Sequence, residues 1–95
     1  MIRLQHKSSA QVEGFAKELT TAINQWSQKY SWDCQALGPS EAPISKIKHY
    51  YRWQLMVKSP SVNDLLGVLR AVREYVNHRK SPVQVSLDVD PAHGN

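Results

Sequence analysis

The chain has a single cysteine, and it has no apolar run long enough to cross a membrane. One cysteine excludes an internal disulfide, and Cys34 alone cannot bind zinc, which usually takes four cysteine or histidine ligands. Such cysteine usage fits a reducing compartment. Residues 1–7 also lack the apolar core of a signal peptide. The sequence therefore predicts a cytoplasmic chain that neither enters nor crosses a bilayer.

Glycine is also scarce, and none of the four glycines stands in a pattern that supports catalysis. Gly14 and Gly67 fall within predicted helices rather than in phosphate-binding loops, and no serine occupies a Gly-x-Ser-x-Gly motif. The junction at 6–9 reads His-Lys-Ser-Ser and lacks the glycine-rich anion loop of an acylphosphatase. The four histidines are scattered without ligand spacing. We expect the isolated chain to be non-catalytic and to bind no cofactor.

Two carboxylates near the end of the chain are the one pair with a spacing that a metal site could use. Asp88 and Asp90 stand two residues apart on a predicted strand and so share one face. Without a third carboxylate at a fixed offset they make a weak metal site. The expected roles are structural, with Asp88 pairing with Arg52 or Arg3 across the sheet and Asp90 setting the turn before Pro91. We therefore expect no bound metal.

Length and charge set broad limits on what the chain does. Ninety-five residues suffice for one domain, spanning 1–95, and are too few for a second, catalytic one. Hydrophobic residues make up 41% of the chain, which suits a small globular fold rather than a disordered segment. Twelve Lys and Arg against eight Asp and Glu give a net charge of +4. This excess favours acidic partners, such as nucleic acid or an acidic peptide.

Hydrophobic periodicity divides the chain into six elements. A period of two is typical of a half-buried strand, whereas apolar residues at helical spacing indicate an amphipathic helix. Ser8 and Gln11 form a capping signal at the start of the first helix, and Gly38-Pro39 ends the second strand before a loop of about ten residues. The elements expected in order are strand 1–6, helix 8–29, strand 32–37, strand 50–58, helix 62–79 and strand 82–90.

This order predicts an α+β, ferredoxin-like split βαβ fold. Short connections and right-handed crossovers convert βαββαβ into a four-stranded antiparallel sheet with both helices on one face. Tyr51 and Trp53 share a face with Leu55 and Val57, and this face should pack under the helices. The opposite face of the sheet has no predicted cover. It carries Arg3, Gln5, Arg52, Gln54, Met56, Lys58, Gln84, Ser86 and Asp88.

A basic and aromatic cluster lies where the expected loop enters the third strand. Lysine and arginine there could neutralise phosphates, while a tyrosine ring or a guanidinium plane could stack on a base. The open face does not match an RNA-recognition motif, which would carry aromatic residues on its central strands. A second basic group, at Arg70, Arg73, Arg79 and Lys80, is expected to be a solvated helix face. The predicted DNA-binding residues are Lys46, Lys48, His49, Tyr50, Arg52 and Lys58.

Four short motifs occur in an order and spacing that resemble a known family. They are Gly38-Pro39, Ala42-Pro43-Ile44, Tyr51-Arg52-Trp53-Gln54 and Asp88-Val89-Asp90-Pro91. On these motifs the chain resembles the C-terminal domain of primosomal protein N′, the PriA replication-restart DNA helicase. The resemblance extends from the long loop through the final strand, and the first strand and helix match in pattern only.

The resemblance implies a fold and a set of partners. The family domain is ferredoxin-like, and it is the last domain of an ATP-dependent DNA helicase. It is understood to bind branched or single-stranded DNA, to pack on the helicase core of the parent chain, and to help bind the acidic tail of single-stranded-DNA-binding protein. By motif position, Tyr50, Arg52 and Gln54 are the expected protein-docking residues. Family members commonly have an arginine where this chain has Tyr50, so Lys48, His49 or Arg52 would have to replace that donor.

Two hypotheses of different classes follow. In the first, the chain is a DNA-binding and protein-docking module of a replication-restart helicase. Its working surface then comprises Lys46, Lys48, Tyr50, Arg52, Gln54 and Lys58. In the second, it is a purely structural domain that packs on the helicase core and has no ligand of its own. An excised domain and a short stand-alone relative are both open.

Overall fold

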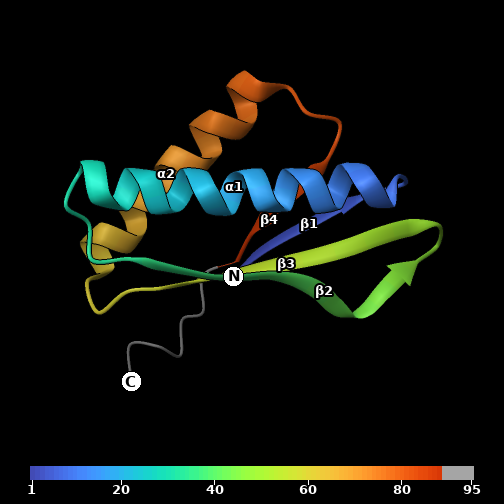
Figure 1. Ribbon diagram of the computed structural model, residues 1–95, viewed down its shortest axis with the longest axis horizontal. Helices are drawn as coiled ribbons and strands as arrows, with labels where there is room; N and C mark the ends of the chain where they lie inside the picture. Colours follow the sequence, from blue (N-terminus) through green and yellow to red (C-terminus); the bar gives the residue numbers. More distant parts are fainter. Residues whose placement is uncertain (89–95) are drawn as a thin grey trace.

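A computed structural model gives the structure of the protein and describes residues 1–88. The four strands form one antiparallel sheet in the order β2-β3-β1-β4, and Figure 1 shows both helices above it. This is the α+β, ferredoxin-like arrangement predicted from the sequence. The elements are β1 (Ile2–His6), α1 (Ser9–Lys29), β2 (Gln35–Ile47), β3 (Tyr50–Lys58), α2 (Val62–Arg79) and β4 (Gln84–Leu87).

The core lies between the two helices and one face of the sheet. Ile2 and Leu4 of the central strand β1 are fully buried, as is Leu55 opposite Ile2 on β3. Each such side chain contributes about 1.5–3 kcal/mol by leaving water. Tyr51 and Trp53 pack against this cluster, as predicted. The helices complete it with Val12, Phe15, Ala16, Leu19, Ile23, Val68 and Val72.

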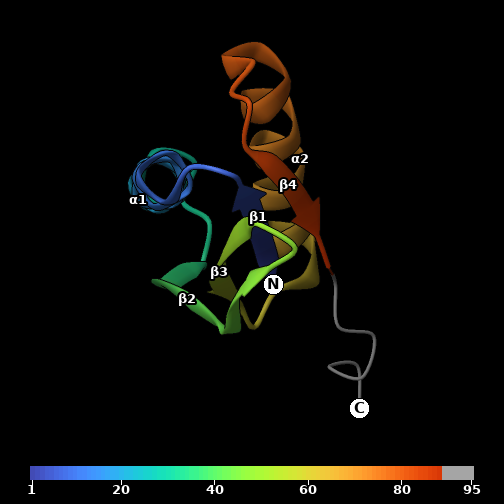
Figure 2. The ribbon, with the colours of Figure 1, turned by 90° about the vertical axis from the view of Figure 1, so that its right-hand side faces the viewer.

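Both helices begin at a serine cap, and the cap of α1 is the one predicted. Ser8 is the N-cap of α1, and its hydroxyl accepts a hydrogen bond from the Gln11 N–H at 3.3 Å. Ser61 caps α2 in the same way, accepting from the Asp64 N–H at 3.2 Å. Lys80 ends α2 in the left-handed conformation, with φ 52°. In Figure 2 the first helix is seen end-on, while α2 lies beside β4.

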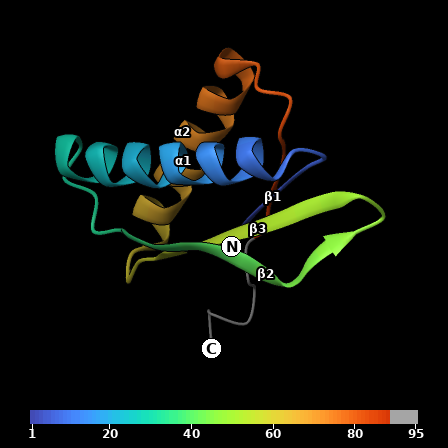
Figure 3. The same cartoon turned by 45° about the vertical axis from the view of Figure 1, so that its right-hand side comes forward.

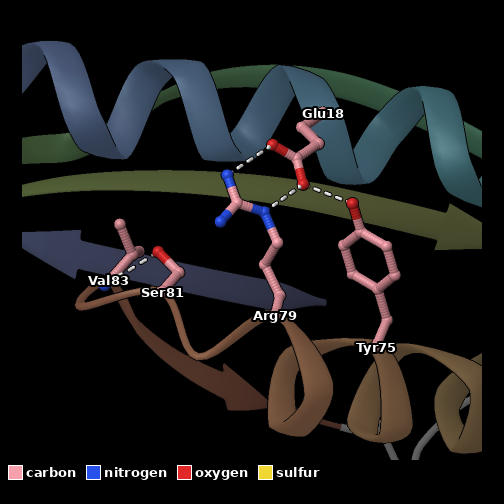
Figure 4. A network of polar contacts seen from close by, with 5 residues as sticks. All are labelled: Glu18, Tyr75, Arg79, Ser81 and Val83. Carbon is pink, nitrogen blue, oxygen red and sulfur yellow. Dashed lines mark hydrogen bonds and ion pairs between the residues drawn. The ribbon is translucent and has the colours of Figure 1, made fainter.

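A polar bridge joins the two helices at one end of the core (Figure 4). The carboxylate of Glu18 on α1 accepts hydrogen bonds from the Arg79 Nε, at 2.9 Å, and from the Tyr75 hydroxyl, both on α2. The Arg79 side chain holds the pKa of Glu18 below its ordinary value of 4.5, and the Tyr75 hydrogen bond adds to the shift. Arg79 is exposed, as expected for this basic group, and it also pairs with a carboxylate that α1 supplies.

The prediction of a loop of about ten residues after Gly38-Pro39 is wrong. Strand β2 continues to Ile47, and its pairing with β3 is interrupted at two irregularities, between Leu37 and Ser40 and between Glu41 and Lys46. Proline lacks a ladder donor and is tolerated in edge strands and bulges. Because β2 is the edge of the sheet, the irregularities accommodate the prolines and the strand resumes after each. The Gly38–Pro39 peptide bond is cis.

The second strand begins later than expected, and the last strand is shorter than expected. Strand β2 begins at Gln35, because the Asp33 N–H donates to the Asp64 carboxylate at 2.9 Å and is drawn toward α2. The prediction placed the last strand at 82–90, but β4 covers only Gln84–Leu87. Pro82 has no N–H, and the Val83 N–H donates to the Ser81 hydroxyl at 3.2 Å, so the ladder starts at Gln84, two residues later than predicted. Residues 89–90 lie outside the described chain.

The two helical glycines provide a matched test of packing. An added Cβ on Gly67 would stand 2.9 Å from the Trp32 ring, whereas nothing lies within 4 Å of one on Gly14. Alanine gains about 1 kcal/mol over glycine in a helix, while overpacking costs about 1–3 kcal/mol. Gly14→Ala should raise the free energy of unfolding measured in urea, and Gly67→Ala should lower it. Equal stabilisation by both changes would contradict the packing of Trp32 on α2.

The helix bridge predicts a pH dependence of stability. A lowered folded-state pKa stabilises the fold above the ordinary carboxylate pKa, and this contribution is lost as pH falls through the lowered value. Glu18→Gln should therefore cost about 1 kcal/mol at neutral pH and much less in acid. The control is Glu13→Gln, which removes the same charge from an exposed pair with Lys17 on α1. A pH-independent difference between Glu18→Gln and wild type would contradict the bridge.

Candidate functional site

The candidate site is built on the turn end of the β2–β3 hairpin. Ile47 and Tyr50 pair directly, leaving only Lys48 and His49 in the turn. Both turn residues are left-handed, with φ 50° and φ 72°, as a two-residue hairpin of the mirror-image type requires. In Figures 1 and 3 this end of the hairpin projects past the end of α1. Two of the predicted DNA-binding residues thus stand at the most extended point of the sheet.

Beside the turn, the uncovered face of the sheet is hollowed. Tyr50 and Arg52 are successive residues of β3 on this face, and both are half-buried. Gln5 of β1 is paired with Arg52 and closes the hollow on the side of the sheet centre. The space measures about 370 Å³, and it is lined by Gln5, Ile47, Lys48, Tyr50 and Arg52.

Local hydrogen bonds hold the polar residues of this hollow in place. A guanidinium N–H of Arg52 donates to the Ile44 carbonyl at 3.3 Å, which ties β3 to the irregular part of β2. The Gln5 amide donates to the Gln84 side-chain oxygen at 2.6 Å. Within residues 1–88, neither Lys48 nor Arg52 has a carboxylate partner. Their charges are therefore available to an anion in the hollow.

The remaining predicted site residues are not gathered at this hollow. Lys46 pairs with Tyr51 on the opposite, helix-covered face, and its ammonium lies 5.1 Å from the Tyr51 ring centroid. Gln54 is on the open face, one step beyond Arg52, paired with Arg3. Lys58 stands at the far end of β3, roughly 25 Å from Tyr50 along the strand. The structure thus unites Lys48, Tyr50 and Arg52 and separates Lys46 and Lys58 from them.

Two lining residues were missing from the predicted site. The alternation of strand 1–6 predicts that Gln5 is on the open face. Nothing in the sequence indicates that it pairs with Arg52. Ile47 fell in the segment expected to be a loop, and its side-chain direction follows from the continued strand. The bulge between Glu41 and Lys46 sets which face each residue of the hairpin end takes. That shift could not be read from spacing.

Other candidate chemistry has a structural explanation within the described residues. Asp88 pairs with Arg3 at 3.2 Å, one of the two predicted partners, and both side chains are exposed. Asp90 lies outside the described residues.

Residues 1–88 contain no cluster of three or more His, Cys, Asp or Glu able to hold a metal ion. In that part of the chain, neither helix is long and apolar enough to span a membrane. Burial raises the pKa of the Cys34 thiol, which disfavours the nucleophilic thiolate.

Comparison with known proteins gives a family match over nearly the whole chain. A model of the primosomal protein N C-terminal domain matches residues 1–92. The replication restart protein PriA of Haemophilus influenzae is 44% identical over 57 residues, covering 60% of this chain and 8% of that protein. PriA of Bacillus subtilis is 33% identical over 61 residues, with shares of 62% and 8%. The similarity to each relative is thus limited to a small part of a much longer protein.

The hairpin turn provides a test of the site geometry. Two non-glycine residues with positive φ each cost of order 1 kcal/mol, and Asn-Gly is the preferred pair in such a turn. The double change Lys48→Asn with His49→Gly should therefore raise the free energy of unfolding by about 1 kcal/mol, measured by urea denaturation. Destabilisation by this pair would mean that the turn is not a two-residue hairpin of this type.

Proposed function

This chain belongs to the family of primosomal protein N C-terminal domains, and from that premise we propose that it is a DNA-binding and protein-docking module of a replication-restart protein. It helps a parent helicase hold branched or single-stranded DNA at stalled forks, and it offers a contact to the acidic tail of single-stranded-DNA-binding protein. The module itself performs no catalysis. ATP-dependent unwinding belongs to other parts of the parent chain.

The observation that carries this proposal is the hollow at the turn end of the uncovered sheet face. Lys48 and Arg52 border it without a carboxylate partner in residues 1–88. Phosphate binding by such side chains releases counterions and supplies most sequence-independent affinity for nucleic acid. Arg52 already donates to the Ile44 carbonyl, which orients its guanidinium and lowers the entropy lost when an anion binds.

Tyr50 favours a single-stranded element over an intact duplex. Its ring lines the hollow beside both cations, and an aromatic face of this kind can stack on an unpaired base. Stacking is worth about 1–3 kcal/mol per base and is largely independent of sequence. A base paired within a duplex exposes no such face. We therefore place a single-stranded arm of a fork, rather than its duplex, at the hairpin end.

The peptide contact uses neighbouring residues of the same strand. In this proposal Arg52 binds a carboxylate of the acidic tail through its free guanidinium donors, and Gln54 donates from one step further along the open face. Tyr50 stands where the family commonly has an arginine, so one bidentate donor is missing and Lys48 supplies the second positive charge. DNA and the tail then compete for the same cations.

A second candidate function rests on a different part of the open face. Leu37 and Met56 pair directly across β2 and β3, and their exposed fractions are 36% and 40%. Burial of these two side chains against the helicase core of the parent chain would stabilise docking without any ligand. In this second function the chain is a purely structural domain, and its basic residues only keep the surface polar.

DNA affinity and its salt dependence separate the two functions. The measurement is fluorescence anisotropy of a labelled fork with a single-stranded arm, at low and near-physiological salt. The double variant Lys48→Ala with Arg52→Ala should lose about 1–3 kcal/mol of binding free energy. Its plot of log affinity against log salt should flatten by roughly 1.4, since two single-strand phosphate contacts are removed.

The matched control removes two positive charges from the helical side. Lys29→Ala with Arg70→Ala changes the net charge by the same amount at exposed helix positions. It should leave both the affinity and the salt slope close to those of the wild type. Equal loss in both variants would mean that net charge alone drives binding. An unchanged affinity in the folded Lys48/Arg52 variant would exclude the proposed surface, and no binding by the wild type would favour the docking role.

A further inference from the structure

The edge of the sheet opposite the hairpin is formed by β4, and its outer side is unpaired within the described residues. In the strand order β2-β3-β1-β4, strand β4 has a neighbour only in β1. Met1 and Asp88 exchange backbone hydrogen bonds at 2.6 and 2.9 Å. Since hydrogen-bonded and non-bonded pairs alternate in an antiparallel ladder, Ser86 and Gln84 also bond to β1. The N–H and C=O groups of Val85 and Leu87 therefore point outward.

A groove runs along this edge, between β4 and α2. It is lined by Val85 and Leu87 of β4 and by Val76 of α2, above the fully buried Val72. Figure 2 shows the two elements beside each other, and among residues 1–88 no further strand lies beyond β4. The groove measures about 220 Å³, and its lining is completed by two polar residues on successive turns of α2, Arg73 and Asn77.

The charge of the groove is positive. Arg73 is exposed and has no ion-pair partner in residues 1–88. Arg70 lies one turn before it, and Glu74 is the only acidic residue among the last ten residues of the helix. A second copy of this chain would bring like charges together, because a two-fold β4 to β4 contact places both Arg73 side chains at one interface. The charge instead favours an acidic partner.

We infer that the β4 edge binds an extended peptide segment of a partner protein, one with apolar side chains at alternate positions and a carboxylate beside them. The segment adds a strand to the sheet, so that its backbone bonds to the outward groups of Val85 and Leu87. Its apolar side chains enter the groove against Val76, Val85 and Leu87, and a carboxylate on the same face of the segment pairs with Arg73. This site is separate from the hairpin hollow and does not depend on the proposed DNA function.

Amide NMR spectra of the 95-residue chain test this inference. The probe is a short acetylated peptide, Thr-Val-Thr-Val-Thr-Glu-Thr, whose two valines and glutamate share one face of an extended strand. Binding should shift the amides of Val85, Leu87, Val72 and Val76, and it should leave those of Tyr50 and Arg52 unchanged. The same peptide with proline for its central valine should not bind, because proline removes a donor from the new strand pair. Replacing the glutamate with lysine should also abolish binding.

A charge reversal distinguishes the groove from general attraction. Arg73→Glu should lower the affinity for the peptide about tenfold, as expected for the loss of one charge-assisted contact. Arg70→Glu, the same change one turn away and outside the groove lining, should leave the affinity within about twofold. Equal weakening by both changes, peptide shifts on the hairpin face, or no shifts at all would overturn the inference. Concentration-dependent shifts at Val85 and Leu87 without peptide would also overturn it, because a second copy would then occupy the edge.

Discussion

Burial of both helices against a single face of the sheet is the interaction on which the rest of this structure depends. Ile2, Leu4 and Leu55 are fully buried under the helices, and these side chains lie on alternate positions of β1 and β3. The intervening residues must then face the other side. No element within residues 1–88 covers that side, so the polar and basic residues of β1 and β3 stay accessible. The position of the core therefore determines where a partner can bind.

The irregular edge strand β2 decides how that accessible face is used. Its pairing with β3 is interrupted twice, and each interruption shifts the register of the following segment. As a result Ile47 shares the open face with Tyr50, while Lys46 lies on the face of Tyr51. The bulged segment also supplies the Ile44 carbonyl that fixes Arg52. Bulges that redirect side chains are common next to binding sites, and here they concentrate an aromatic ring and two cations at one end of the hairpin.

The two edges of the sheet differ in kind. Edge β2 is long, carries two prolines and ends in the charged turn, features that discourage further strand pairing. Edge β4 is short and regular, and the outward groups of Val85 and Leu87 stand beside an apolar groove and Arg73. The hairpin end is suited to anions and stacked bases, whereas the β4 edge is suited to a peptide backbone. Two partners could then occupy the module at the same time.

Periodicity was sufficient for the fold but only partly for the site. The alternation of Tyr51 and Trp53 with Arg52 and Gln54 placed these residues on the correct faces, since side-chain direction in a regular strand depends on sequence alone. The prediction from periodicity failed between Gly38 and Lys48. The cost of proline in a strand depends on whether that strand is at the edge of the sheet, and the order of the strands in the whole sheet decides this. The same context explains Arg79, whose carboxylate partner lies on the other helix. Neither the edge position of β2 nor the partner of Arg79 can be recognised from the neighbouring residues in the sequence.

The proposed binding of single-stranded DNA to the uncovered sheet face, at the turn end of the β2–β3 hairpin, can be tested on the chain itself. The chain is titrated with a short oligothymidine at low salt, and binding is followed in amide NMR spectra. The largest shifts should occur at Gln5, Lys48, Tyr50 and Arg52, and they should become smaller as salt is raised. Shifts centred on the helices, or shifts that do not change with salt, would contradict the proposed binding.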